Sequence, residues 1–218
     1  DLIINGTGSL TVNASYRNGI ASKDDLTIDG GNIAVIAAND GLRGKDSIPI
    51  SAGSFIIDAE NDGIKSNNDS ESDKGWIVIE DGDFTITAGN DGIQAETELT
   101  VRGGTFTIQS GGGAAEAEPK QQQAPGRGGI GRQQPGGAEQ DPAAAVQTAV
   151  ETESELSDTT STDDSFKGIK AGTKITVSGG SFTINSADDA VHSNGDLLIE
   201  GGTFAIATGD DAFHADSN

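Results

Sequence analysis

The stretch GIKAGTKITVSGGSFTINSADD, residues 168–189, is one complete unit of the repeat that decides the fold. It opens with a Gly-Ile pair, passes through a polar turn to an Ile-Thr-Val run, and continues after Gly-Gly into Ser-Phe-Thr-Ile. Apolar and polar residues alternate in both runs, which indicates β-strands and not helices. Gly-Gly pairs and Asn-Asp-Gly sequences supply the turns. One unit is therefore predicted to hold three short strands joined by tight turns.

Equivalent pairs recur at a fixed period along the chain. The spacing is 22 residues in four of the six steps, 29 in one and 76 in another, where a long insert interrupts; the pairs begin at Gly19, Gly41, Gly63, Gly92, Gly168, Ala190 and Ala212. A short fixed period with strand-like content indicates a solenoid. Parallel crossovers are right-handed by default. We therefore predict an all-β, right-handed parallel β-helix (solenoid) of about seven 22-residue coils.

Stacked units would bury apolar residues in interior columns. One column would hold Ile33, Phe55, Phe84, Phe106, Phe182 and Phe204, and another Ile20, Leu42, Ile64, Ile93, Ile169, Val191 and Phe213. Each fully buried side chain of this kind contributes roughly 1.5–3 kcal/mol. A sandwich or a stack of hairpins would not explain the constant period.

The repeat divides the chain into a predicted β-helix domain, residues 1–110 and 165–218, and an insert, residues 111–164. The insert is rich in Gly, Gln and Pro and ends in an acidic Ser/Thr tract, so we expect a flexible loop, with a short helix possible over Ala143–Leu156. It would be a lid or tether, or a tolerated surface insertion. Because the chain starts and stops inside a coil, we expect a fragment, either a monomer or part of a larger surface protein.

The overall composition limits the classes of molecule that the protein can bind. The formal net charge is −22, with 35 acidic against 13 basic residues. This excludes nucleic acid, which requires a basic surface, and favours cations. There is no cysteine, so neither a disulfide framework nor a thiolate metal site is expected. No run is long enough to cross a membrane.

An acidic column precedes the Gly-Ile pairs and is the predicted metal site. Adjacent coils lie ~4.8 Å apart, where two bare carboxylates repel by about 1 kcal/mol in water and about 3.5 kcal/mol at an effective dielectric of about 20. Oxygen-only clusters of this kind suit Ca²⁺. The alternative is that these residues form turns by bonding their own backbone. The candidate ligands are Asn39, Asp40, Asn61, Asp62, Asn90, Asp91, Asp188, Asp189, Asp210 and Asp211.

A basic column follows the Gly-Ile pairs: Arg43, Lys65, Lys170, His192 and His214, interrupted by Ala21 and Gln94. It would bind an acidic polysaccharide or balance the neighbouring acids. Lys167 stands where the acidic column would place an acid, and would replace a cation by bridging Asp91 and Asp189. The single tryptophan, Trp76, would stack on a sugar ring or anchor the seven extra residues before it.

These segments resemble a bacterial family of carbohydrate-binding parallel β-helix proteins, typified by a clostridial cell-surface protein. The similarity rests on Asn61-Asp62-Gly63-Ile64, Asn90-Asp91-Gly92-Ile93, Phe166-Lys167-Gly168-Ile169-Lys170, Asp188-Asp189-Ala190-Val191-His192-Ser193 and Asp210-Asp211-Ala212-Phe213-His214-Ala215. The family is similar in fold to calcium-dependent polysaccharide lyases of family nine. The resemblance implies bound Ca²⁺ and a cellulose or pectic (uronic-acid) polymer as partner, without clear lyase activity.

Three functions follow as expectations. The leading one is a non-enzymatic, secreted or bacterial cell-surface module that binds plant cell-wall or acidic polysaccharide, with no catalytic residue. A calcium-dependent pectate-type lyase is the second, with Lys65, Lys167 or Lys170 as the base. A structural stalk or adhesin is the third. For a binder, the predicted ligand-contacting residues are Arg43, Lys65, Lys167, Lys170, His192, His214 and Trp76.

Overall fold

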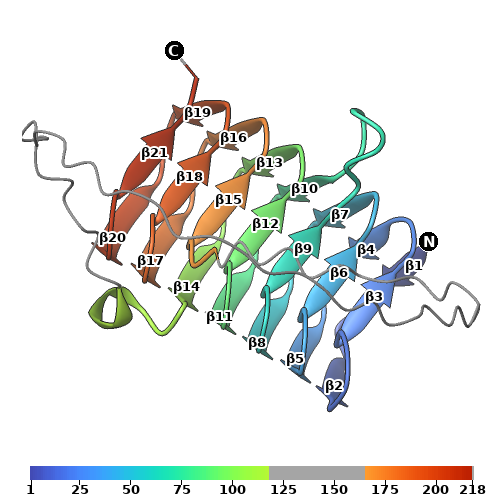
Figure 1. Cartoon of the computed structure of the whole chain (residues 1–218). Coiled ribbons are helices and arrows are strands. Elements are labelled where there is room, and N and C mark those ends of the chain that lie inside the picture. The colour runs from blue at the N-terminus through green and yellow to red at the C-terminus, as the bar shows by residue number, and fades with distance from the viewer. Residues whose placement is uncertain (118–164, 218) are drawn as a thin grey trace, which may run out of the picture. The chain divides into compact units, whose positions relative to one another are not determined.

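The computed structural model of the chain describes residues 1–117 and 165–217. Within these ranges each repeat contributes three short strands, and equivalent strands of successive repeats pair side by side and in parallel (Figure 1). The result is three parallel sheets of seven strands each, so the predicted parallel β-helix of seven coils is confirmed. The insert beyond residue 117, with the helix expected over residues 143–156, lies outside the described residues.

Sheet A holds the first strand of each coil. Its order is β1-β4-β7-β10-β13-β16-β19, with the bounds β1 Leu2–Ile4, β4 Leu26–Ile28, β7 Ser47–Ile50, β10 Trp76–Ile79, β13 Glu98–Val101, β16 Lys174–Val177 and β19 Asp196–Ile199.

Sheet B has the longest strands of the three sheets, and its strands follow the Gly-Gly turns. Its order is β2-β5-β8-β11-β14-β17-β20, with the bounds β2 Ser9–Ala14, β5 Asn32–Ala37, β8 Ser54–Ala59, β11 Asp83–Ala88, β14 Thr105–Ser110, β17 Ser181–Ser186 and β20 Thr203–Thr208. The second glycine of these turns has a positive φ, +104° at Gly104 and +108° at Gly180, which a side chain would strain.

Sheet C consists of three-residue strands that follow the acidic turns. Its strands are β3 Ile20–Ser22, β6 Leu42–Gly44, β9 Ile64–Ser66, β12 Ile93–Ala95, β15 Ile169–Ala171, β18 Val191–Ser193 and β21 Phe213–Ala215. Strand β15 pairs directly with β12, Ile169 beside Ile93, so the stack continues although 76 residues separate the two positions. After β14, residues Ala114–Glu116 form a short 3₁₀ helix, η1.

The core runs along the axis of the stack as columns of identical or similar side chains. Phe84 and Phe106 are in register, and their ring centroids lie 4.7 Å apart with an interplanar angle of 2°. The stack is formed by Phe55, Phe84, Phe106, Phe182 and Phe204. The predicted aromatic column is thus present, and burying it contributes roughly 1.5–3 kcal/mol per ring.

Steric hindrance explains why glycine begins most of the Gly-Ile pairs. A Cβ atom on Gly92 would lie 2.5 Å from the carbonyl oxygen of Gly168 and 2.4 Å from Ile108 Cγ2. These distances are well below ordinary van der Waals contact, so the close approach of the next coil favours glycine here. The same approach places each acidic turn directly against the turn of the next coil.

Candidate functional site: a ladder of buried aspartates

The turn before sheet C carries a column of carboxylates that are almost completely buried. Asp40 and Asp91 are 1% exposed, Asp62 is 2% and Asp189 is 4% exposed. We call these four, with the exposed Asp211 of the last coil, the aspartate ladder. Burying an ionised carboxylate is costly unless hydrogen bonds and charge partners compensate for the lost water.

The first compensation comes from the backbone of the next coil. Asp62 Oδ1 accepts the N–H of Asp91 at 2.9 Å, Asp91 Oδ1 accepts the N–H of Lys167 at 2.8 Å, and Asp189 Oδ1 accepts the N–H of Asp211 at 2.9 Å. Each of these three aspartates therefore connects its own turn to the turn of the next coil. Hydrogen bonds to a charged acceptor are about twice as strong as neutral ones.

The asparagines beside the ladder form a second set of cross-coil bonds. Asn39 Nδ2 donates to Asn18 Oδ1 at 2.7 Å, and Asn61 Nδ2 donates to Asp40 Oδ1 at 2.6 Å. Asn90 Nδ2 donates to Asn61 Oδ1 at 2.6 Å. In this part of the chain the asparagine side chains therefore donate to the neighbouring coil. Turn chemistry alone would predict hydrogen bonds to their own backbone.

The second compensation for the buried charge is the basic column on the outer face of sheet C. Lys65 Nζ lies 2.7 Å from Asp62 Oδ2, and Arg43 Nη1 lies 3.7 Å from Asp40 Oδ2. The acid and the base stand three residues apart, so the turn carries one and the strand presents the other. The basic column therefore does balance the neighbouring acids, one of the two roles the sequence suggested.

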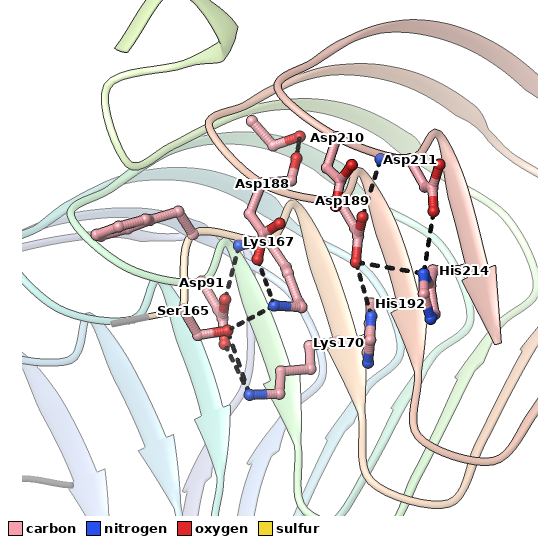
Figure 2. A network of polar contacts seen from close by, with 12 residues as sticks. Asp91, Ser165, Lys167, Lys170, Asp188, Asp189, His192, Asp210, Asp211 and His214 are labelled. Atoms are coloured by element: carbon pink, nitrogen blue, oxygen red, sulfur yellow. Dashed lines mark hydrogen bonds and ion pairs between the residues drawn. The ribbon is translucent and has the colours of Figure 1, made fainter. Parts of the chain in front are cut away.

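The last two coils repeat this pairing with histidines. His192 Nδ1 lies 2.8 Å from Asp189 Oδ2, and His214 Nδ1 lies 3.1 Å from Asp211 Oδ2 (Figure 2). The hydrogen bonds to Asp211 and Asp216 raise the pKa of His214.

Asp91 is the exception in the ladder, because its own coil has Gln94 at the basic position. Its nearest cation is Lys170 of the next coil, whose Nζ lies 3.8 Å from Asp91 Oδ2. Burial, followed by the neighbouring charge of Asp62, raises the pKa of Asp91 to about 6. Burial and Asp62 likewise raise the pKa of Asp40. Neighbouring carboxylates therefore disfavour each other's charged form, as expected from the close spacing of the coils.

Lys167 does not bridge Asp91 and Asp189 as predicted from its position. Its ammonium lies 2.6 Å from Asp188 Oδ2, and only its backbone N–H reaches Asp91 (Figure 2). The reason is local: Asp188 occupies the outer place in its turn, where earlier coils have asparagine, and faces the lysine directly. Ser165, which the sequence analysis missed, lies 3.4 Å from Lys167 Nζ and 3.2 Å from Lys170 Nζ.

One part of the predicted metal column gathers oxygens only. Within the described ranges, Asp188, Asp189 and Asp210 can each offer a carboxylate oxygen within 4.8 Å of the others. This donor set has the chemistry that Ca²⁺ prefers. In the N-terminal run, by contrast, Asp40, Asp62 and Asp91 bind the backbone, asparagine amides and the basic column. Calcium binding at either place stays a prediction.

Trp76 does not belong to the basic column. It begins β10 in sheet A, half-buried, whereas the basic column lies on sheet C. Asn68, which is 2% exposed, makes hydrogen bonds within the seven extra residues. Its side chain donates to Asp46 Oδ1 at 2.7 Å and accepts the backbone N–H groups of Ser70 and Glu71 at 3.0 and 3.2 Å. Lys74 adds an ion pair to Asp46 at 3.1 Å.

Fold and site together define a class: a parallel β-helix whose coils are tied along one edge by aspartates and whose adjoining face presents a column of hydrogen-bond donors. Comparison with known proteins identifies the family of the chain. A family profile described as "Carbohydrate-binding domain-containing protein" matches residues 1–212. The chain therefore belongs to this carbohydrate-binding domain family, which supports the predicted carbohydrate-binding function and a non-catalytic role.

A curated relative agrees with this assignment. A carbohydrate-binding domain-containing protein of Acetivibrio thermocellus is 57% identical over 37 residues, which are 17% of this chain and 13% of that protein. No solved structure matches the chain. Among the described residues, no helix is long and apolar enough to span a membrane.

Proposed function

We propose that the protein binds a polysaccharide of the plant cell wall, cellulose or a uronic-acid polymer, along the outer face of sheet C. The observation that carries the proposal is the alignment of the basic column. Arg43 is in register with Lys65, and Lys170 with His192 and His214, so from β6 to β21, with Gln94 on β12 between Lys65 and Lys170, N–H donors repeat at each strand step of ~4.8 Å. A polymer presents hydroxyl or carboxylate groups at regular intervals, and a regular row of donors suits it.

The position of Gln94 strengthens the choice of this face. It lies between Lys65 and Lys170 on β12, in register with both. Within the described ranges its side chain has no hydrogen bond or ion pair, and it is half-buried. The amide offers both a donor and acceptor at the centre of the row, where a sugar hydroxyl would use both.

The electrostatics distinguish the two polymer classes. Because the aspartate ladder already neutralises the basic column, the face offers hydrogen bonds more than net positive charge. A neutral glucan needs no more than this. A uronic-acid polymer would approach a chain of net charge −22, so its binding would need a cation between the two anionic surfaces.

For that cation we propose Ca²⁺ at Asp188, Asp189 and Asp210. Their carboxylate oxygens converge, and Ca²⁺ accepts six to eight oxygen ligands in flexible geometry. Bound there, it would supply positive charge at the edge of sheet C. A secreted or cell-surface location is part of the same proposal, since plant cell-wall polymers lie outside cells, and the protein would act as a monomer or as part of a larger surface protein.

Co-sedimentation with insoluble cellulose and with cross-linked polygalacturonate tests the proposal, each with calcium and with a chelator. We expect binding to at least one polymer, and we expect binding to polygalacturonate to require calcium. Gln94→Ala should weaken binding, while Lys174→Gln on sheet A should not. Binding that survives Gln94→Ala but is lost in Trp76→Ala would place the polymer on sheet A. Release of unsaturated products would show a lyase instead.

A further inference from the structure

Two histidines stack at the end of the basic column and have no counterpart in the other five coils. His192 and His214 are in register on β18 and β21, and their rings are 4.7 Å apart at an interplanar angle of 19°. The side chain of His192 is 12% exposed and that of His214 is 36% exposed. Carbohydrate binding as proposed above does not require imidazoles here, because lysine or arginine fills this place in three of the five earlier coils.

Both nitrogens of each ring face an oxygen acceptor. On the Nδ1 side, Asp189 Oδ2 lies 2.8 Å from His192 and 3.9 Å from His214, and Asp211 Oδ2 lies 3.1 Å from His214 (Figure 2). On the Nε2 side, Asn194 Oδ1 lies 2.9 Å from His192, and Asp216 Oδ1 lies 2.9 Å from His214.

Each ring has oxygen neighbours on both sides but, as a neutral imidazole, only one N–H group. A neutral imidazole carries one N–H, so it cannot donate to oxygens on both sides. A ring nitrogen that carries no proton is free to bind a metal ion, while the N–H on the other side of the ring donates to its oxygen neighbour. A single divalent ion on the Nδ1 side would face both rings and the shared carboxylate of Asp189.

The oxygen acceptors around the two rings resemble those around histidines that bind metals. Such a histidine almost always donates its second ring N–H to a carboxylate or carbonyl oxygen, which leaves the other nitrogen as the ligand. Asp216 and Asn194 are such acceptors on the Nε2 side. Asp189 is fixed as well, because its Oδ1 accepts the backbone N–H of Asp211 at 2.9 Å and its Oδ2 points to both rings.

We propose that Asp189, His192 and His214 bind a divalent transition-metal ion of the zinc type. Asp189 Oδ2 and the two imidazole nitrogens lie within 4.8 Å of one another. Zinc binds nitrogen and oxygen ligands at about 2.0–2.2 Å, so the two nearly parallel rings would rotate toward one another to contact one ion together with Asp189. Mixed imidazole and carboxylate donors select zinc-like ions over Ca²⁺, which prefers oxygen alone. The ion would join the last two described coils across sheet C.

Calorimetry on the full chain after chelator treatment tests this site, with zinc and calcium titrated separately. We expect one saturable zinc site, a zinc-dependent rise in melting temperature, and loss of both in His192→Gln and in His214→Gln. Lys174→Gln on β16 of sheet A, outside the basic column, is the control and should keep zinc binding. Cobalt(II) added in place of zinc should give visible absorption bands that the histidine variants lack.

The zinc site and the proposed calcium site share Asp189, so calcium uptake distinguishes them through the ligands that they do not share. The histidine variants should take up calcium as the wild type does, whereas Asp188→Asn with Asp210→Asn should lose calcium and keep zinc. Circular dichroism confirms that each variant is folded. Absence of saturable zinc binding by the wild type would overturn the proposal, as would zinc binding that persists when both histidines are replaced.

Discussion

Lys170 lies 3.8 Å from Asp91, the acid of the preceding coil, whereas Lys65 pairs with Asp62 of its own coil. The shift arises because Gln94 occupies the basic position beside Asp91. A fully buried carboxylate thus depends on a cation from the next coil. The ion pair joins β15, the strand that resumes the stack after the insert, to the coil before it.

Replacing Lys170 by methionine should therefore destabilise the protein. The change leaves the buried Asp91 carboxylate without its cation, while Oδ1 keeps the backbone N–H of Lys167, so we expect a loss of about 1–3 kcal/mol. Arg102→Met is the control, because Arg102 pairs with Glu80 on an exposed part of the surface, where such pairs contribute less than about 1 kcal/mol. Urea denaturation measures both, and equal losses would show that Lys170 does not compensate Asp91.

Much of the fold could be predicted from the repeat, but the partners within the site could not. The 22-residue period, the three strands and the phenylalanine column all follow from spacing and alternation. The hydrogen bonds that connect Asp62 to the next coil do not, because they depend on which oxygen faces which backbone N–H group. Ser165 adjoins a low-complexity tract and Asn68 lies in an irregular segment, so neither carries a repeat signal. Lys167 pairs with Asp188 because the carboxylate of the adjacent turn faces it. Its place in the repeat did not predict this contact.

The phenylalanine column predicts a sharp contrast between neighbouring positions of β14. Phe106 is fully buried between two other rings, so Phe106→Ala should lower the free energy of unfolding by about 3–5 kcal/mol. Thr107 points outward and is exposed, so Thr107→Ala should change it by no more than about 0.5 kcal/mol. Thermal or chemical unfolding measures the pair. Similar values for both would contradict the register of sheet B.

The raised pKa of Asp91 predicts a pH dependence with a definite sign. The folded value is about 6 and the ordinary value is 3.8, so between them the folded state binds more protons than the unfolded state. Stability from this group therefore increases as the pH falls from about 7 to about 5. Asp91→Asn removes this ionisation. In chelator-treated protein, wild type should gain stability relative to the variant over this range, and an unchanged difference would refute the buried charge.

The loop between β9 and β10 offers a local test of its anchor. Asn68→Ala removes the side chain that accepts the N–H groups of Ser70 and Glu71, so both amides should exchange hydrogen faster while core amides of β11 stay protected. Asp73→Ala, an exposed change in the same loop, should leave the exchange of both amides unchanged. If Trp76→Ala releases the two amides and Asn68→Ala does not, the tryptophan is the anchor after all.

The most direct test of the central claim is to block one face of the β-helix at a time. The polysaccharide that wild type binds most tightly would be titrated with Gln94→Trp, which fills the middle of the sheet C face, and with Thr107→Trp, which places the same bulk on the exposed face of sheet B. Polysaccharide lying along the basic column predicts that Gln94→Trp loses binding and Thr107→Trp retains it. Full binding by Gln94→Trp, with loss in Thr107→Trp, would contradict the account.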